Sequence, residues 1–262
     1  MKTWMKVVLG GVAGISVLVG MIFWLTGGVT KAGDDFFAAV QNDDIDAAYA
    51  LLSDDFKAGT SKEELETYLA ANAFDKVREA SWGGRMMTGG VAELEGTVTT
   101  EGGSKIPIKL RLIDSESGWL INAIEKESAG FKDSGGGSAA VPPVDKQQQL
   151  FRDTITVYAE SLADRSMQKL WDNSSGLFRR QFTVAQLNEA YGRNFRFAED
   201  YAEISKMTPI IDNAGIDDGG FFVIRGHYPI NPQPLYVRQS FAYEGVDWVS
   251  SGLVLQVGQP PE

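Results

Sequence analysis

The feature that most constrains the fold of this chain is an internal repeat. Residues 36–69 align with residues 158–191 without a gap, at an offset of about 122 residues. Under that shift apolar and helix-capping positions coincide, as in the pairs Val40 and Leu162, Ile45 and Met167, Tyr49 and Trp171, Phe56 and Phe178, Ser61 and Thr183, and Leu65 and Leu187. Each copy precedes a strand-rich segment. The repeat therefore predicts two homologous domains, each large enough for its own core.

Helical patterns open each predicted domain. In the first, helices are expected over DDFFAAVQ and IDAAYALL, and Asp43 or Asp44 is a candidate N-cap of the second helix. Ser61 followed by Glu64 forms a capping box before KEELETYLAAN. In the second, the helices are expected over QQQLFRDTITVYAESL, SMQKLWDNS and TVAQLNEAYGRNF, with Thr183 as the cap of the last.

Alternating segments separated by Gly-rich turns follow the helices and predict strands. In the first domain these are VREASW, VAELEGTVTT, KIPIKLRLID and GWLINAIEK; in the second, YAEISKMTPII, GFFVIRGHYPI, LYVRQSFAYE and DWVSSGLVLQV. Trp119 aligns with Trp248, so the offset has grown to about 129 and NPQP at 231–234 is an inserted loop. Helices followed by an antiparallel meander define an α+β fold class.

A Gly/Ser/Pro-rich stretch at residues 129–144 predicts a linker. We expect domains at 30–128 and 145–262. Residues 7–29 contain no charged side chain, and about 20 apolar residues suffice to span a bilayer. Residues 1–29 therefore predict a short tail and one transmembrane helix.

The charges that flank this stretch set the expected orientation. Lys2 and Lys6 precede it, and Asp34 and Asp35 follow it. The positive-inside rule then places the amino terminus in the cytoplasm and both domains outside it. We expect the membrane to be a bacterial inner membrane and the domains to be periplasmic. Small residues spaced four apart within the stretch are candidates for helix packing in lipid; they are Gly10, Gly14, Ser16 and Gly20.

Composition excludes several classes of function. The chain has no cysteine and one histidine, which excludes thiolate chemistry and leaves no second imidazole for a metal site. The net charge of −11 argues against nucleic acid as a partner. No cofactor or metal is expected.

The helix–helix–helix–meander order resembles the nuclear transport factor 2-like superfamily. The resemblance rests on FFAAVQNDDIDAAYALLS, FKAGTSKEELETYL and GWLINAI in the first domain, and on SLADRSMQKLWDNSS, FRRQFTVAQL, FVIRGHY and DWVSSGLVL in the second. It implies a curved sheet wrapped around helices, with a conical pocket in each domain. Its members include isomerases, dehydratases, ligand-binding modules and non-catalytic assembly domains. Membrane-anchored tandem versions resemble inner-membrane assembly components of bacterial conjugation and secretion machines.

Candidate chemistry is sparse. His227 could act as a general base beside Tyr228 or an acidic neighbour, although a surface or strand-packing role is the simpler interpretation. Turn formation and helix capping account for the acidic runs, whose residues are Asp43, Asp44, Asp46, Asp54, Asp55, Asp212, Asp217 and Asp218. Four arginines that flank the third helix of domain two could dock an acidic partner or compensate the helix dipole; they are Arg179, Arg180, Arg193 and Arg196.

These observations favour a non-enzymatic, single-pass membrane protein that displays two domains outside the cytoplasm. We expect it to serve as an interaction or assembly subunit, with other membrane proteins or a second copy as partner. Binding of a small apolar ligand in the cones is the alternative. An isomerase- or dehydratase-like enzyme is a third hypothesis.

Overall fold

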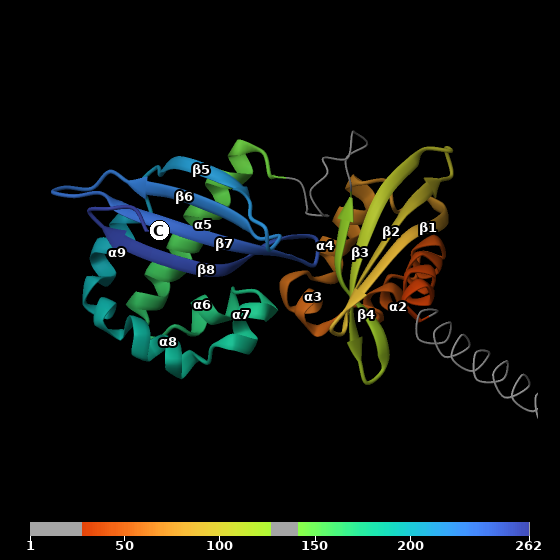
Figure 1. Ribbon diagram of the computed structural model, residues 1–262, viewed down its shortest axis with the longest axis horizontal. Helices are drawn as coiled ribbons and strands as arrows, with labels where there is room; N and C mark the ends of the chain where they lie inside the picture. The colour runs from red at the N-terminus through yellow and green to blue at the C-terminus, as the bar shows by residue number, and fades with distance from the viewer. Residues whose placement is uncertain (1–27, 127–140, 262) are drawn as a thin grey trace, which may run out of the picture. The chain divides into compact units, whose positions relative to one another are not determined.

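The computed structural model describes residues 28–126 and 141–261, which fold as an α+β protein. They contain two four-stranded antiparallel sheets, with strand orders β1-β2-β3-β4 and β5-β6-β7-β8. The chain divides into two compact units between β4 and α5. In each unit the helices precede the meander, in the order that the sequence predicts, and pack on one face of its sheet (Figure 1).

The first unit begins within a helix that is described from residue 28 to residue 41 and is called the first helix below. Three shorter helices follow, α2 (Ile45–Ala50), α3 (Asp54–Gly59) and α4 (Lys62–Ala71). The strands are β1 (Val77–Thr88), β2 (Val91–Thr100), β3 (Lys105–Ser115) and β4 (Gly118–Lys126). All four agree with the segments expected from sequence, except that β1 continues six residues beyond Trp82.

Side-chain caps fix where the helices of the first unit start. Asp44 accepts a hydrogen bond from the Ala47 N–H, so it is the N-cap of α2. Ser61 and Glu64 form both hydrogen bonds of a capping box before α4, as the sequence predicts. The first two described residues of the first helix are packed within this unit: Gly28 lies against Trp119, and Val29 is fully buried. The first unit therefore includes two residues that we assigned to the anchor.

The second unit opens with the long helix α5 (Val144–Ala163), whose first residue is the last of the expected linker. Then come α6 (Gln168–Asp172), α7 (Gly176–Gln181), α8 (Val184–Tyr191), the 3₁₀ helix η1 (Gly192–Phe197) and α9 (Ala198–Ile204). The strands are β5 (Ile210–Ile216), β6 (Phe222–Tyr228), β7 (Leu235–Glu244) and β8 (Asp247–Val257). Thr183 caps α8, as predicted, and it does so through a second capping box with Gln186.

One strand of the second unit was wrongly placed from sequence. YAEISKMTPII was expected to be a strand, but its first part belongs to α9 and β5 starts only at Ile210. Acidic Glu199 and Asp200 occupy the first turn of α9, where they favour a helix, and Ile204 is buried in the core. Tertiary burial on a helical face therefore outweighs the local alternation of YAEIS.

The core of the second unit lies between α5 and the sheet. From α5 come Phe151, Ile155 and Tyr158; from β6, Phe222 and Ile224; all five are fully buried. Side chains alternate along a strand, so Val223, Arg225 and His227 point to the opposite face of β6. We call that opposite side of β5–β8 the outer face of the second sheet.

Several aligned elements of the repeat begin or end at equivalent residues. The first helix and α5 end at equivalent positions, and the short helices α3 and α7, which the sequence analysis missed, start at the equivalent residues Asp54 and Gly176. β-Bulges also coincide. Register shifts place extra residues at Gly83 and Asn122 in the first sheet, and at the equivalent Asp212 and Ser251 in the second. A further shift at Arg78 in β1 has no counterpart in the described strands of the second unit. Bulges bend and twist the strands that carry them, so both sheets are bent at matching points.

Candidate functional site

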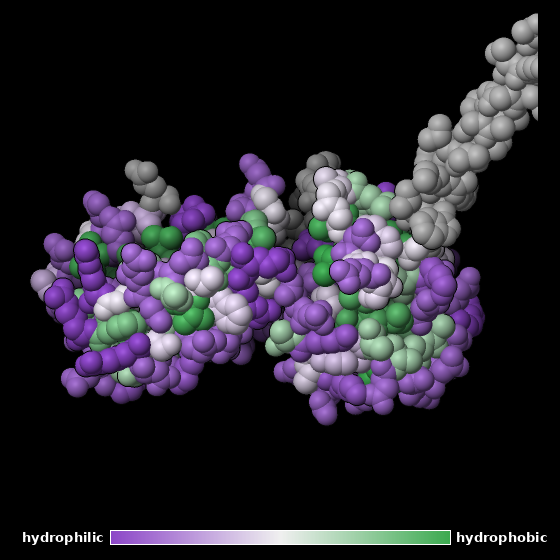
Figure 2. Space-filling model, turned by 90° about the horizontal axis from the view of Figure 1, so that it is seen from below, coloured by the Kyte–Doolittle hydropathy of each residue, from purple (hydrophilic) through white to green (hydrophobic). Residues whose placement is uncertain are grey.

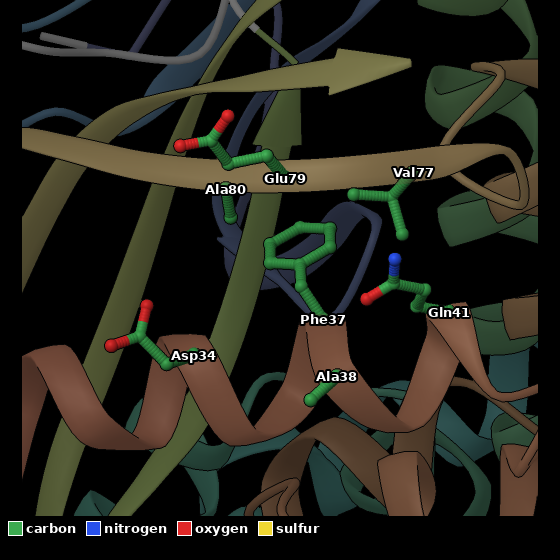
Figure 3. Close-up of a pocket in the computed structure, with 7 residues that line it drawn as sticks. All are labelled: Asp34, Phe37, Ala38, Gln41, Val77, Glu79 and Ala80. Carbon is green, nitrogen blue, oxygen red and sulfur yellow. The ribbon is translucent and has the colours of Figure 1, made fainter. Parts of the chain in front are cut away.

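A small cavity in the first unit lies between the first helix and the edge strand β1 (Figure 3). Its volume is about 110 Å³, and it is lined by Asp34, Phe37, Ala38, Gln41, Val77, Glu79 and Ala80. Ligand pockets usually measure about 300–1,000 Å³, so this cavity is too small for an ordinary substrate. A second hollow of about 250 Å³ lies beside Trp82 and Arg85.

Two hydrogen bonds connect the walls of the small cavity. The indole Nε1–H of Trp82 donates to Asp34 Oδ1 at 2.7 Å, and Gln41 Nε2 donates to the carbonyl oxygen of Arg78 at 3.2 Å. Phe37 projects from the helix toward β1 between them (Figure 3). Asp34 thus holds the helix against the strand. Its carboxylate is occupied by a structural bond, which gives no support to a catalytic role.

His227 lies on the outer face of the second sheet, next to Asp212. His227 Nδ1 and Asp212 Oδ2 are 2.9 Å apart, and the imidazole side chain is 21% exposed. The bulge in β5 places Asp212 at this position, because Ile211 pairs with Gly226 and Asn213 with Arg225. The ring of Tyr236 lies 5.3 Å from the imidazole.

Tyr228 points the other way, into the core. Its ring lies 5.8 Å from that of Phe151, and its hydroxyl is buried without a hydrogen-bond partner among the described residues. Burial raises the pKa of the Tyr228 hydroxyl above the usual value for tyrosine, and the positive charge of Arg152 opposes this only in part. The expected pairing of His227 with Tyr228 is therefore wrong, because the two side chains lie on opposite faces of β6. The acidic side chain that contacts His227 is that of Asp212.

The four candidate arginines belong to two separate helices. Arg179 and Arg180 are in the last turn of α7, and Arg179 lies over Trp171 with its Cζ atom 5.9 Å from the ring centroid. Arg193 and Arg196 are exposed in η1, not at the end of an α-helix as we expected. A 3₁₀ helix has three residues per turn, so these two still share a side.

Two carboxylates of the acidic runs accept hydrogen bonds from nearby backbone N–H groups. Asp44 caps α2, and Asp217 accepts hydrogen bonds from the N–H groups of Gly219 and Phe221 in the β5–β6 turn. In residues 28–126 and 141–261 no three histidine or acidic side chains gather to hold a metal ion. Asp44 therefore caps a helix and Asp217 closes a turn, whereas Asp46 forms an ion pair with Lys62 and Asp212 contacts His227.

The membrane segment falls almost entirely outside the described residues. The candidate packing residues Gly10, Gly14, Ser16 and Gly20 are all outside them. Among the described helices, none has both the length and the hydrophobicity that a bilayer crossing requires.

Comparison with known proteins adds no assignment to this geometry. No protein-family model matches the chain, and no curated protein matches it significantly.

Proposed function

We propose that this protein is a non-enzymatic, membrane-anchored module that binds other proteins outside the cytoplasm, as an accessory or scaffolding subunit of a membrane complex. Residues 7–27 would form the anchor, because they are uncharged and about 20 residues suffice to cross a bilayer, whereas Gly28 and Val29 belong to the first unit. Lys2 and Lys6 on one side and Asp34 on the other favour a cytoplasmic amino terminus and extracytoplasmic units. A bacterial inner membrane is the proposed location.

We also propose that both units have the nuclear transport factor 2-like fold. In each unit helices precede a four-stranded antiparallel meander, and two bulged strands bend the sheet at equivalent positions. This arrangement supports the resemblance that the sequence suggests.

The observation that carries the proposed function is the apolar tip of the β1–β2 hairpin. Met86 is 66% exposed, Met87 38% and Val91 39%, and all three lie within a stretch of six residues. Hydrophilic residues cover most of each unit in the face shown in Figure 2, with smaller hydrophobic areas among them. Strand alternation places Met86 and Val91 on one face of the hairpin and Met87 on the other, so the tip is apolar on both faces. Exposed apolar side chains gathered in one region favour protein contacts, and methionine adapts to varied partner surfaces. The hairpin tip is therefore the surface that we propose contacts a partner protein.

The interior of the second unit gives little support to the ligand-carrier alternative. Phe151, Tyr158, Tyr228, Phe222 and Phe241 are all less than 2% exposed and fill the space between α5 and the sheet. A bound apolar molecule would have to displace these rings. Ligand carriage remains the second hypothesis, and the next experiment separates it from the first.

The test is affinity purification of the full-length chain from its native membrane in mild detergent, followed by mass spectrometry. We expect stoichiometric membrane proteins to co-purify. The double substitution Met86→Ser and Met87→Ser should reduce their yield. Val144→Ser is the matched control, because Val144 is 62% exposed but lies at the start of α5. A chain that purifies without protein partners would refute the proposal, and a co-purifying small molecule would favour ligand carriage.

A further inference from the structure

Two arginines lie directly opposite each other on the outer face of the second sheet. Arg225 of β6 pairs with Arg238 of β7 in the antiparallel register, which places both side chains on the same face with their Cβ atoms about 5 Å apart. Like charges in directly opposed positions destabilise a sheet. The pair therefore needs a compensating anion or a functional reason.

The described residues do not supply the anion. Neither guanidinium has a hydrogen bond or ion pair with another residue in the part of the chain that the structure describes, and the Nε atom of Arg238 is buried without an acceptor. Asp212 is the acidic residue on the neighbouring strand, but its carboxylate contacts His227 instead. A buried donor without an acceptor is unfavourable, so an acceptor brought by a ligand would remove that penalty.

The surroundings of the pair are partly apolar. The register places Val254 beside Arg238 on β8, and Tyr236 beside His227 one row away. Val254 is 43% exposed. Ile210 of β5, which pairs with His227 of β6, is 46% exposed. A surface that combines paired guanidinium groups with apolar side chains resembles the arginine- and aromatic-rich centre of protein interfaces more than a closed pocket for a free anion.

We propose that Arg225 and Arg238 form a docking site for an acidic polypeptide segment of a partner protein. The planar guanidinium groups suit carboxylates because each can donate two parallel hydrogen bonds. Carboxylates of the partner would neutralise the opposed charges, while its apolar side chains cover Val254 and Ile210. This inference builds on the proposed function, since it names a second contact surface and the chemistry of the partner that it accepts. The proposed site for an acidic partner is therefore Arg225 and Arg238, in place of the arginines of α7 and η1.

The experiment measures binding of a short poly-L-glutamate peptide to the full-length protein in detergent, at low and at physiological ionic strength. The chain carries a net charge of −11, so general electrostatic attraction to this probe is absent and binding requires a local basic site. We expect Arg225→Gln with Arg238→Gln to raise the Kd at least about tenfold, because charge-assisted hydrogen bonds are lost. Added salt should weaken binding to the unsubstituted protein.

The matched control is Arg193→Gln with Arg196→Gln, which removes the same charge from η1 and should leave the Kd unchanged. If the double substitution at Arg225 and Arg238 prevents folding, Arg225→Gln alone provides the test, since that side chain is exposed.

The inference is overturned if the peptide does not bind, or if both double variants weaken binding equally. It is also overturned if only inorganic phosphate or phosphatidylglycerol vesicles bind in a manner that depends on Arg225 and Arg238. Any of these results, obtained while membrane proteins still co-purify with the chain, would leave the proposed function intact. If no membrane protein co-purifies with the unsubstituted chain, the proposed function is refuted, whatever the result of the peptide experiment.

Discussion

The backbone N–H of Ser53 donates a 2.9 Å hydrogen bond to the carbonyl oxygen of Ile121, which connects the residue before α3 to strand β4. The second unit has the equivalent bond, in which the backbone N–H of Ser175 donates to the carbonyl oxygen of Ser250 at 2.7 Å. A parallel β-bridge accompanies it in each unit, Leu52 with Ile121 in the first and Ser174 with Ser250 in the second. The start of the short helix is therefore fixed to the last strand in the same way in both units.

The hydroxyl groups at this junction have two partners in each unit. Ser53 Oγ accepts from the Phe56 N–H at 3.1 Å and donates to Asn122 at 2.7 Å. Ser175 Oγ accepts from the Phe178 N–H at 3.2 Å and bonds to the hydroxyl of the bulge residue Ser251 at 3.1 Å. Each bulge thus turns a polar side chain toward a buried N-cap.

We expect Ser53→Ala and Ser175→Ala each to lower the free energy of unfolding by about 1–2 kcal/mol, because each change removes an N-cap and leaves a bulge side chain without its partner. Urea denaturation followed by circular dichroism measures the change. Ser117→Ala alters an exposed turn serine and should change stability by less than about 0.5 kcal/mol. Equal effects of all three substitutions would contradict the prediction.

Two strand glycines lie where the backbone leaves no space for a side chain. A Cβ at Gly96 would lie 2.4 Å from the carbonyl oxygen of Ser81, and one at Gly226 would lie 2.5 Å from that of Ile210. We expect Gly96→Ala and Gly226→Ala to destabilise the protein by about 1–3 kcal/mol through overpacking. Gly215→Ala is the control in a neighbouring strand, since no other atom lies within 4 Å of the position that its Cβ would occupy. In thermal unfolding, Gly96→Ala and Gly226→Ala should melt at lower temperatures than Gly215→Ala. Equal melting temperatures of the three variants would refute this expectation.

The neighbours His227 and Tyr228 should respond very differently to truncation. His227→Ala removes a partly exposed contact with Asp212, so we expect a loss of no more than about 1 kcal/mol. Tyr228→Ala empties a fully buried site against Phe151 and should cost about 3–5 kcal/mol. Chemical denaturation of both variants measures the difference. A larger loss for His227→Ala would show that the imidazole supports the core.

Most secondary structure could be predicted because local signals and tertiary packing agree. The capping box at Ser61, the cap at Thr183 and the strands β2, β3, β4, β7 and β8 all lie where the sequence places them. The prediction failed at α9, where residues 201–204 alternate like a strand but bury Ile204 from a helix. Short helices of six residues, such as α3 and α7, carry too few periodic positions to be recognised.

The candidate sites were harder to predict because they depend on strand register. The contact between Asp212 and His227 requires a bulge, which shifts one residue relative to the partner strand and leaves no composition signal. The pairing of Arg225 with Arg238 depends on the NPQP loop that joins β6 to β7. The bond between Trp82 and Asp34 joins residues 48 apart in sequence. Alternation assigns each of these side chains to a face, but only the register brings them together.

Buried tyrosines should make the second unit sensitive to alkaline pH. Burial raises the pKa of Tyr158 and of Tyr228 above the value of about 10 that they have when unfolded. Above that pH the unfolded chain releases protons that the folded chain keeps, so stability is complete below pH 10 and falls as the pH rises. Each such group contributes a slope of up to about 1.4 kcal/mol per pH unit. Tyr228→Phe removes one group and an unpartnered hydroxyl, so it should preserve stability at neutral pH and flatten the alkaline loss. Urea denaturation from pH 8 to 11 tests this; an unchanged slope would contradict it.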